Sequence, residues 1–380
     1  MERNLLLTPG PSLVPFLIRE TQAQEIIHHR TKEFREILGK VNLGLKYVFC
    51  TRNPVLILSS SGTGAMEASV SNFLSAKDTV IIVEGGKFGE RWKEIALKYN
   101  LEVISYKIEW GSAPEAGYIK DLLDNHEEVK AVFTTLCETS TATVYDIESI
   151  AKVTKDRDIL LVVDAISGLG QDKLLTDEWG VDIVVSGSQK GFMLPPGLGF
   201  LSISDKARDF MNHSSLPRYY FDLGKALKSY EKNDTPFTPA ISLITGLEVA
   251  LNLIKREGLK ERWEKFCKFA KAVRAAAKAL GLNPFSQWPS VSVTAVVSPE
   301  KIKSSELVKH LRNKYGVSIA AGQADFKDKI FRIAHMGAIE EQDLVVGFYF
   351  LEKALKDLGY KVKAGVSVQK IEEILSEGVK

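Results

Sequence analysis

The sequence predicts an α/β fold: a mainly parallel, seven-stranded sheet with helices on both faces, followed by a smaller C-terminal α+β domain. Two observations carry this prediction. Short apolar segments rich in Val and Ile alternate along the chain with longer segments whose apolar residues recur at helical spacing. Some of the short segments, such as residues 159–163, are apolar throughout, which is typical of parallel strands buried on both faces.

Length and composition predict two domains. With 380 residues, 45% of them hydrophobic, the chain can bury a large core. We expect an N-terminal arm at residues 1–20, a large domain at 21–257 and a small domain at 258–380, with Gly258 as the joint.

Charge and cysteine content narrow the classes of partner. The 50 basic and 48 acidic residues give a net charge of +2, so no electrostatic feature predicts a nucleic-acid or membrane partner. Cys50, Cys137 and Cys267 lack the spacing of a metal site or a disulfide framework, which favours free thiols and a reducing compartment. We expect no bound metal. Since the N-terminus has no signal-peptide pattern and no segment reaches membrane-spanning length, we expect a cytoplasmic protein.

The first elements in order are an arm and a helical region. Thr8-Pro9-Gly10-Pro11 cannot form regular helix or a central strand, so it is either a stiff extended arm or a surface turn. Residues 21–45 have helical spacing, interrupted by His28-His29-Arg30.

The large domain then alternates strands and helices. We expect helices at 88–99 and 146–156, the latter with Asp146 as its N-cap, and a long helix at 241–255 after the irregular segment 230–239. The expected strands are residues 55–58, 79–83, 102–106, 130–135, 159–163, 181–185 and 199–203.

The small domain mixes both kinds of element. We expect strands at 292–297, near 317–320 and around Arg332, and a turn with one short helix in 361–380. The expected helices of this domain are residues 261–280, 305–314 and 340–358.

Two polar residues at strand ends are the strongest functional signal. Asp164 closes the strand at 159–163, and Lys190 follows the strand at 181–185. Ligands of open α/β sheets bind beyond the carboxyl ends of the strands, where both residues lie. A lysine and a carboxylate there suit pyridoxal 5'-phosphate (PLP): the lysine forms a Schiff base with the aldehyde, and the carboxylate pairs with the pyridine nitrogen. A helix cap and a surface lysine are the alternative interpretation.

A phosphate site is predicted after the first strand of the sheet. The strand at 55–58 leads into a turn containing Gly62, Thr63 and Gly64 and then into a helix, whose free N-terminal N–H groups can bind phosphate. Glu67 stands where a Rossmann fingerprint needs glycine, and no Gly-Lys-Ser/Thr follows as in a P-loop. A strand, turn and helix without ligand is equally compatible with the pattern. Phe88, in a glycine-rich loop, could stack on a planar ring or anchor the core.

The order and spacing of these segments resemble the class V aminotransferases among the fold-type I PLP enzymes, and most of all the alanine/serine–glyoxylate aminotransferase branch. The resemblance spans nearly the whole chain. It rests on TPGP (8–11), HHRTKEF (28–34), SSGTGAMEA (60–68), GGKFGERW (85–92), ETSTA (138–142), VDAISGLG (163–170), SGSQKGFMLPPGLGF (186–200), TPFTPAISLITGLEVAL (235–251) and FRIAHMG (331–337).

The resemblance implies a role for each matching residue. Lys190 holds PLP and shuttles a proton, while Asp164 binds the pyridinium nitrogen. Arg332 receives the substrate α-carboxylate, next to Pro9 and Gly10 of the arm. The implied cofactor contacts are Thr63, Gly64, Ala65 and Gln189 at the phosphate, Phe88 and Ile166 on the two ring faces, Thr139 near the phenolic oxygen, and Thr235 and Thr238 from the partner subunit of a homodimer with a shared active site.

Two departures leave the substrate open. Phe88 stands where close relatives often have Trp, and Ala142 stands where Gly is usual. An amino acid of the alanine or serine type and a 2-oxo acid such as glyoxylate or pyruvate are therefore implied at the level of the family, through a ping-pong cycle.

Other functions are compatible with parts of the pattern. A PLP lyase or cysteine desulfurase of the same fold is an alternative. A desulfurase needs a catalytic thiol on a mobile loop of the small domain, yet Cys267 lies in a predicted helix and residues 314–332 contain no Cys. Members of this branch have been labelled subunits of a soluble hydrogenase, so a non-catalytic or regulatory subunit is an alternative, although the chain lacks metal-type Cys clusters. A nicotinamide-dependent dehydrogenase is disfavoured by the missing GxGxxG.

Overall fold

The computed structural model describes residues 4–377, which build two sheets of three or more strands with helices around them. The larger sheet has seven strands in the order β2-β10-β9-β8-β5-β3-β4. Only β10 runs antiparallel to its neighbours. These strands are β2 (Val55–Leu58), β3 (Thr79–Glu84), β4 (Glu102–Lys107), β5 (Val129–Thr135), β8 (Leu160–Asp164), β9 (Ile183–Gly187) and β10 (Gly199–Ile203). The predicted fold class, an α/β protein with seven mainly parallel strands, is confirmed.

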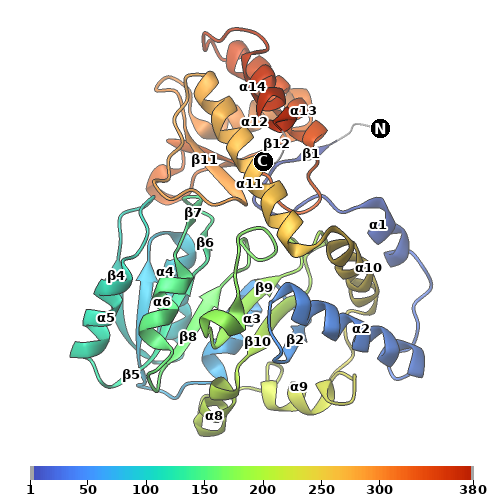
Figure 1. Ribbon diagram of the computed structural model, residues 1–380, viewed down its shortest axis with the longest axis vertical. Coiled ribbons are helices and arrows are strands. Elements are labelled where there is room, and N and C mark those ends of the chain that lie inside the picture. The colour runs from blue at the N-terminus through green and yellow to red at the C-terminus, as the bar shows by residue number, and fades with distance from the viewer. Residues whose placement is uncertain (1–3, 378–380) are drawn as a thin grey trace.

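Helices cover both faces of this sheet (Figure 1). Successive residues of a strand point to opposite faces, and so Ile81 and Val83 join one hydrophobic cluster while Val80 and Ile82 join the other. The first cluster takes in α2 (Lys32–Val48), α5 (Ala116–Asn125), α6 (Ile147–Thr154) and α10 (Ile241–Glu257). The second takes in α3 (Gly62–Ser71), α4 (Lys87–Lys98), α8 (Asp205–His213) and α9 (Leu223–Tyr230).

The helical region expected at residues 21–45 is interrupted around His28-His29-Arg30, as the sequence indicates, but it begins earlier, at Phe16, and the break extends over residues 23–31. It is split into α1 (Phe16–Gln22) and α2, and α2 begins after Thr31, whose hydroxyl accepts a hydrogen bond from the Phe34 amide at 3.3 Å. This N-cap stops the helical pattern from running through His28-His29-Arg30. Four helices, namely α5, α7 (Thr176–Trp179), α8 and α9, were not predicted; α5 buries only Ile119 and Leu123, too few for a clear pattern.

A second sheet lies above the first in Figure 1, with the order β11-β14-β13. Its strands are β11 (Val293–Val297), β13 (Ala320–Ala321) and β14 (Ile330–Ala334). Around it lie α11 (Leu259–Ala279), α12 (Ser304–Tyr315), α13 (Glu341–Asp357) and α14 (Val366–Ser376). Gly258 stands between α10 and α11 with φ 85°, a left-handed conformation that favours glycine.

The N-terminus joins this upper part. Strand β1 (Leu5–Leu6) pairs in parallel with β12 (Val317–Ser318), and Leu7 is buried in the same cluster as α11 and α13. The chain then descends to the large sheet. The short hairpin β6 (Cys137–Glu138) and β7 (Thr143–Val144) lies at the junction of the two parts.

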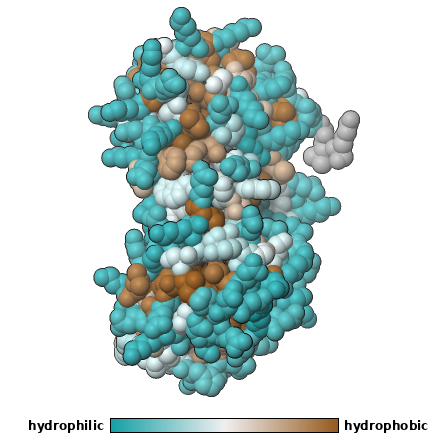
Figure 2. Space-filling model, turned by 90° about the vertical axis from the view of Figure 1, so that its left-hand side faces the viewer, coloured by the Kyte–Doolittle hydropathy of each residue, from teal (hydrophilic) through white to brown (hydrophobic). Residues whose placement is uncertain are grey.

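Hydrophilic side chains cover most of the face that carries β4 and α5, and apolar patches reach the surface near the narrow middle of the molecule (Figure 2). No helix within residues 4–377 is long and apolar enough to cross a membrane.

Candidate active site

Asp164 and Lys190 meet at the carboxyl edge of the large sheet. Strands β8 and β9 are parallel neighbours, and Asp164 pairs with Val185 in their register. Lys190 follows the end of β9 in a tight loop, in which the Met193 amide donates to the Lys190 carbonyl at 3.1 Å. Asp164 is 5% exposed and Lys190 is 9% exposed, and each shifts the pKa of the other. The predicted convergence of the two residues is present.

The Asp164 carboxylate has one hydrogen bond, from the Ile166 amide to Oδ1 at 2.8 Å. Within residues 4–377 no other group bonds to it. Burial raises the pKa of Asp164 to about 7; Glu138 adds to this rise, and the cations Arg91 and Lys190 oppose it. Its second oxygen is available to a ligand.

The Lys190 amine is covered by the N-terminal arm. Its Nζ donates a hydrogen bond to the Pro9 carbonyl, and the Ser12 hydroxyl donates to the Lys190 carbonyl at 2.9 Å. Burial lowers the pKa of Lys190 to about 8, and Asp164 acts in the opposite direction. Gly10, with φ 119°, leaves no room for a side chain, because a Cβ there would lie 2.6 Å from Lys190 Cε and Nζ.

The first turn of α3 leaves backbone donors free beside this pair. Ser61, the N-cap, makes no side-chain cap, and within residues 4–377 the amides of Gly62 and Thr63 have no hydrogen-bond acceptor. The buried Gln189 Oε1 also lacks a partner among the described residues. A Cβ at Gly187 would lie 3.1 Å from that oxygen and 3.3 Å from the Gly62 nitrogen, so the amide side chain lies close to the helix terminus. Such a terminus binds an anion.

An aliphatic and an aromatic side chain lie near this turn. Ile166 packs against Gly62, where a Cβ would lie 2.5 Å from its Cδ1. Phe88 is half-buried and belongs to none of the four hydrophobic clusters of the described chain, so it is not a core anchor. Arg91 lies 4.9 Å from the Phe88 ring centroid, and its Nη1 donates to Thr63 Oγ1 at 3.3 Å. Sequence reasoning missed Arg91, although its place three residues after Phe88 on one helix was a usable signal.

The loop at residues 138–142 brings the upper sheet into the site. Arg332 of β14 donates from Nη1 to the Thr139 carbonyl at 3.0 Å, and from Nε and Nη2 to the Ala321 carbonyl at 3.2 and 2.8 Å. The Thr139 hydroxyl donates to Ser167 Oγ at 2.6 Å. Burial lowers the pKa of Arg332 to about 10, which leaves the guanidinium charged at neutral pH. The hydrogen bonds to the Thr139 and Ala321 carbonyls fix the orientation of the Arg332 guanidinium.

Thr235 and Thr238 lie outside this group. The Thr235 hydroxyl donates to the Phe237 carbonyl at 2.8 Å, and Thr238 is exposed. Both line a small pocket with Ser59 and Tyr220, and within residues 4–377 neither hydroxyl bonds to Lys190 or Asp164.

The residues present fit PLP. A buried amine, a carboxylate with a free oxygen and free amide donors at a helix terminus match the aldehyde, ring nitrogen and phosphate of that cofactor. Comparison with known proteins gives the same answer: the family "Aminotransferase class-V" matches residues 16–334. The chain belongs to the class V aminotransferases.

Similar proteins cover nearly the whole chain. A protein named soluble hydrogenase, small subunit, from Synechococcus sp. is 38% identical over 99% of both chains. The serine–glyoxylate aminotransferase of Hyphomicrobium methylovorum is 35% identical over 95% of this chain and 91% of its own. The crystal structure of an alanine–glyoxylate aminotransferase from Nostoc sp. is 26% identical, covers 94% of this chain and 96% of its own, and has a TM-score of 0.89. The predicted family, PLP as cofactor and aminotransferase class are thereby confirmed.

Glu138 is a further residue of this aminotransferase whose role the sequence did not predict. Its Oε2 accepts hydrogen bonds from the amides of Phe88 and Gly89, both at 3.1 Å. Its Oε1 accepts from the Ser140 amide at 3.1 Å and from the Ser140 hydroxyl. This carboxylate thus ties the first turn of α4, which carries Phe88, to the loop that holds Thr139.

Proposed function

We propose that the protein transfers the amino group of a small amino acid, of the alanine or serine type, to a 2-oxo acid such as glyoxylate or pyruvate in a ping-pong cycle. The names of the serine–glyoxylate and alanine–glyoxylate aminotransferases similar to it support this substrate class. The observation that carries the proposal is the buried Lys190 amine beside the half-satisfied Asp164 carboxylate.

In this proposal Lys190 and Asp164 are the catalytic residues. Lys190 would hold the cofactor aldehyde, and its amine would carry the proton that leaves the substrate α-carbon. A pKa of about 8 gives it a neutral fraction that can accept that proton. Asp164 holds a proton on the ring nitrogen. When bound, PLP supplies a ring that withdraws the negative charge developing at the α-carbon.

The remaining residues bind and orient. Free amides of the first turn of α3 bind the phosphate, and Gln189 contributes through the NH₂ group of its side chain, because its oxygen only accepts hydrogen bonds. Arg332, whose guanidinium is oriented by the Thr139 and Ala321 carbonyls, forms two parallel hydrogen bonds with the substrate α-carboxylate. The proposed assignments of the other contacts are Thr63, Gly64 and Ala65 to the phosphate, Phe88 and Ile166 to the ring faces, Thr139 to the phenolic oxygen, and Pro9 and Gly10 to the substrate.

Borohydride trapping tests the cofactor assignment. We expect the purified protein to be yellow and borohydride to fix the cofactor to it, and Lys190→Ala to lose the fixed cofactor completely. Lys152→Ala, which removes an exposed lysine paired only with Glu148 on α6, should retain it. A wild-type protein that stays colourless and untrapped after addition of PLP would refute the assignment.

Half-reactions test the substrate class. Single amino acids are added to the loaded protein, and conversion to the pyridoxamine form is followed by absorbance. Alanine and serine should convert it within seconds to minutes, whereas a panel in which only dicarboxylic or aromatic amino acids react would refute the proposed class. Arg332→Lys should raise KM for alanine because a lysine cannot form the bidentate contact.

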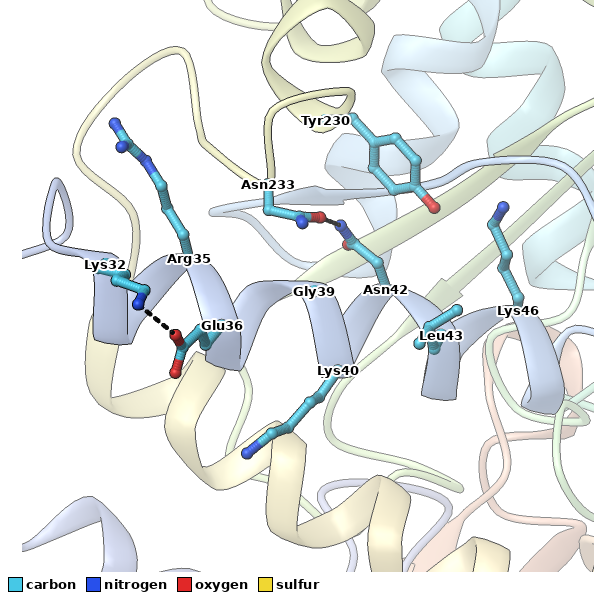
Figure 3. A pocket seen from close by; sticks show the side chains of 10 residues that line it. All are labelled: Lys32, Arg35, Glu36, Gly39, Lys40, Asn42, Leu43, Lys46, Tyr230 and Asn233. Atoms are coloured by element: carbon cyan, nitrogen blue, oxygen red, sulfur yellow. Dashed lines mark hydrogen bonds and ion pairs between the residues drawn. The ribbon is translucent and has the colours of Figure 1, made fainter.

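We also propose that the active form is a homodimer whose sites are shared. Large apolar side chains of the α1–α2 segment are exposed, among them Phe16 at 69%, Ile26 at 69% and Leu43 at 70%. Leu43 also lines a pocket of about 660 Å³ along α2 (Figure 3). The proposal assigns Thr235 and Thr238 to the partner's phosphate site; Arg30 holds that segment, donating to the Thr235 carbonyl at 2.8 Å.

Mixed dimers test the shared site. Lys190→Ala and Thr238→Glu should each inactivate a homodimer, the second by placing a carboxylate at the phosphate. After the two are unfolded and refolded together, about a quarter of the wild-type sites should be restored, because half the dimers are mixed and each has one intact site. No recovery, or an active monomer by light scattering, would contradict this arrangement.

The division into residues 1–20, 21–257 and 258–380 and the cytoplasmic location are further parts of the proposal. Gly258 between α10 and α11 supports the joint, and the free cysteines Cys50, Cys137 and Cys267 support a reducing compartment.

Association with a soluble hydrogenase is a second candidate, favoured by the name of the Synechococcus relative. Co-purification of the protein from its own cells with hydrogen-dependent dye reduction, unchanged by Lys190→Ala, would favour that role. Within residues 4–377 no group of three or more His, Cys, Asp or Glu residues is arranged to hold a metal ion.

A further inference from the structure

Arg262, on the second turn of α11, makes a set of contacts that the proposed mechanism does not use. It is 1% exposed. Its Nε donates to the Gly170 carbonyl at 3.0 Å, and its Nη2 donates to the carbonyls of Gly191 at 3.0 Å and Gly337 at 3.4 Å. Its Nη1 pairs with Glu257 at the end of α10. One guanidinium therefore binds three separate backbone segments.

Each of these segments continues from a proposed active-site residue. Gly191 follows Lys190 directly, and Gly170 lies in the turn after Asp164, which is closed by the Leu169 amide donating to the Ala165 carbonyl at 2.9 Å. Gly337 lies just beyond β14, the strand of Arg332. Lys190, Asp164 and Arg332 are thus each joined along the chain to a backbone segment that Arg262 contacts.

The three segments are also packed against one another. A Cβ at Gly191 would lie 2.3 Å from the Leu169 carbonyl oxygen, and one at Gly337 would lie 3.1 Å from the Lys190 carbonyl oxygen. Because the backbones are this close, a displacement of one segment must displace the others.

The chemistry of the contact requires arginine. A buried cation is costly unless it is paired and fully hydrogen-bonded, so an apolar residue would serve better if packing alone were needed. Glu257 neutralises the charge and also accepts a bond from Lys265 at 3.0 Å, and the Arg262 guanidinium lies 5.0 Å from the Phe266 ring centroid. Only a planar fork with several donors can reach three carbonyls in different directions; a lysine ammonium cannot.

We propose that Arg262 is a positioning residue, which keeps the backbone of Lys190 in register with the segments that follow Asp164 and Arg332. The inference rests on the proposed function for the roles of those three residues. Because Arg262 lies one turn after the Gly258 joint, it also connects movement of α11 to the loop of Lys190.

Two substitutions and a control on the same helix test the proposal in the loaded enzyme. Arg262→Met should lower kcat about 100-fold and Arg262→Lys about 10-fold, with smaller changes in KM, since misplacement of a catalytic group by about 1 Å can cost about 100-fold. Both should shift the pH midpoint of the visible band of the bound cofactor, which reports the environment of the Lys190 nitrogen. Arg274→Lys, which alters a half-buried arginine whose Nη1 donates to the Ser290 carbonyl at 3.0 Å, should change neither value.

Hydrogen exchange gives a readout that does not depend on the cofactor. In the cofactor-free protein, Arg262→Met should speed amide exchange in 165–172, 188–193 and 335–339 and leave β3 and β5 unchanged; Arg262→Lys should do the same to a lesser degree and serves if the Met variant does not fold.

Lower melting temperatures with unchanged kcat per bound cofactor, unchanged pH midpoint and unchanged exchange would show that Arg262 is merely structural. A wild-type protein that never binds PLP would instead refute the proposed function, while the exchange experiment would still decide the role of Arg262.

Discussion

Two buried carboxylates at the same sheet edge, Asp164 and Glu138, differ in how far the protein satisfies them. Glu138 is fully buried and accepts four hydrogen bonds, from the amides of Phe88, Gly89 and Ser140 and from the Ser140 hydroxyl. Asp164 is almost as buried but accepts only one. Burial raises the pKa of both groups.

The difference separates a structural acid from one kept for a ligand. An unsatisfied buried carboxylate is costly, so a protein retains one where a bound group completes it. Glu138 accepts all four of its hydrogen bonds from this chain, and so it connects the first turn of α4 to the loop at residues 138–142. Asp164 is left with a free oxygen next to Lys190, which is what a protonated ring nitrogen would need.

The largest expected effect is the difference in kcat between a variant of Asp164 and the matching variant of Glu138. Asp164→Asn should lower kcat about 100- to 1,000-fold, because an amide does not supply the charge that keeps the ring nitrogen protonated. Glu138→Gln should lower kcat far less. Steady-state rates normalised to borohydride-fixed cofactor measure kcat of both variants. Equal losses of kcat would contradict the different roles of the two acids.

The second largest expected effect is on how the stability of the cofactor-free protein depends on pH when Asp164 is replaced. In the cofactor-free protein the folded-state pKa of Asp164, about 7, lies above its ordinary value of 3.8, so folding favours the protonated acid. Stability from this group is present below pH 4 and is lost as pH rises through 7. Cofactor-free Asp164→Asn should therefore melt above wild type at pH 8, and its advantage should vanish toward pH 4. Melting curves without added PLP measure this; an advantage independent of pH would contradict the assignment.

Glu138→Gln should destabilise the fold itself. The glutamine carbonyl can serve two donors, but its NH₂ group would face the Ser140 amide, and a buried unsatisfied donor costs about 1–3 kcal/mol. Urea unfolding at pH 7 measures the loss. Glu148→Gln, the same change on the surface of α6 where Glu148 pairs with Lys152, should cost less than about 1 kcal/mol.

The smallest effect should come from Ser140→Ala. It removes one of the four bonds to Glu138 and the acceptor of the Lys87 amide, which lies 3.1 Å from Ser140 Oγ. The expected cost is about 1 kcal/mol in urea unfolding, with the cofactor spectrum unchanged. A changed spectrum would show that Glu138 acts on the cofactor as well as on the loops.

The sequence predicted those parts of the site that depend on local pattern. Asp164 and Lys190 could be placed together because the ends of parallel strands share an edge, and apolar runs mark those ends. The departure at Ala142 also has a structural meaning: its φ of 59° is left-handed, which explains why glycine is usual there.

Contacts between distant segments could not be predicted in this way. Arg262 bonds to carbonyls 71 to 92 residues away, and nothing in the helical pattern of α11 distinguishes it from the exposed lysines of the same helix. The same holds for Pro9, whose carbonyl meets Lys190 across 181 positions. The sequence marks a break at His28-His29-Arg30, but the residue at which α2 begins depends on a cap at Thr31, which a periodic pattern does not reveal.

The pairing of β1 with β12 has a consequence for how the protein is made. The arm that covers Lys190 is held at Leu5 by Val317 and at Leu7 by the Ser318 carbonyl, and the Leu7 carbonyl accepts from the Ala334 amide. A ribosome must therefore release more than three hundred residues before the first ten find their place. Until residues 316–318 and 334 have been made, the arm has no strand to pair with and nothing anchors it over the Lys190 amine.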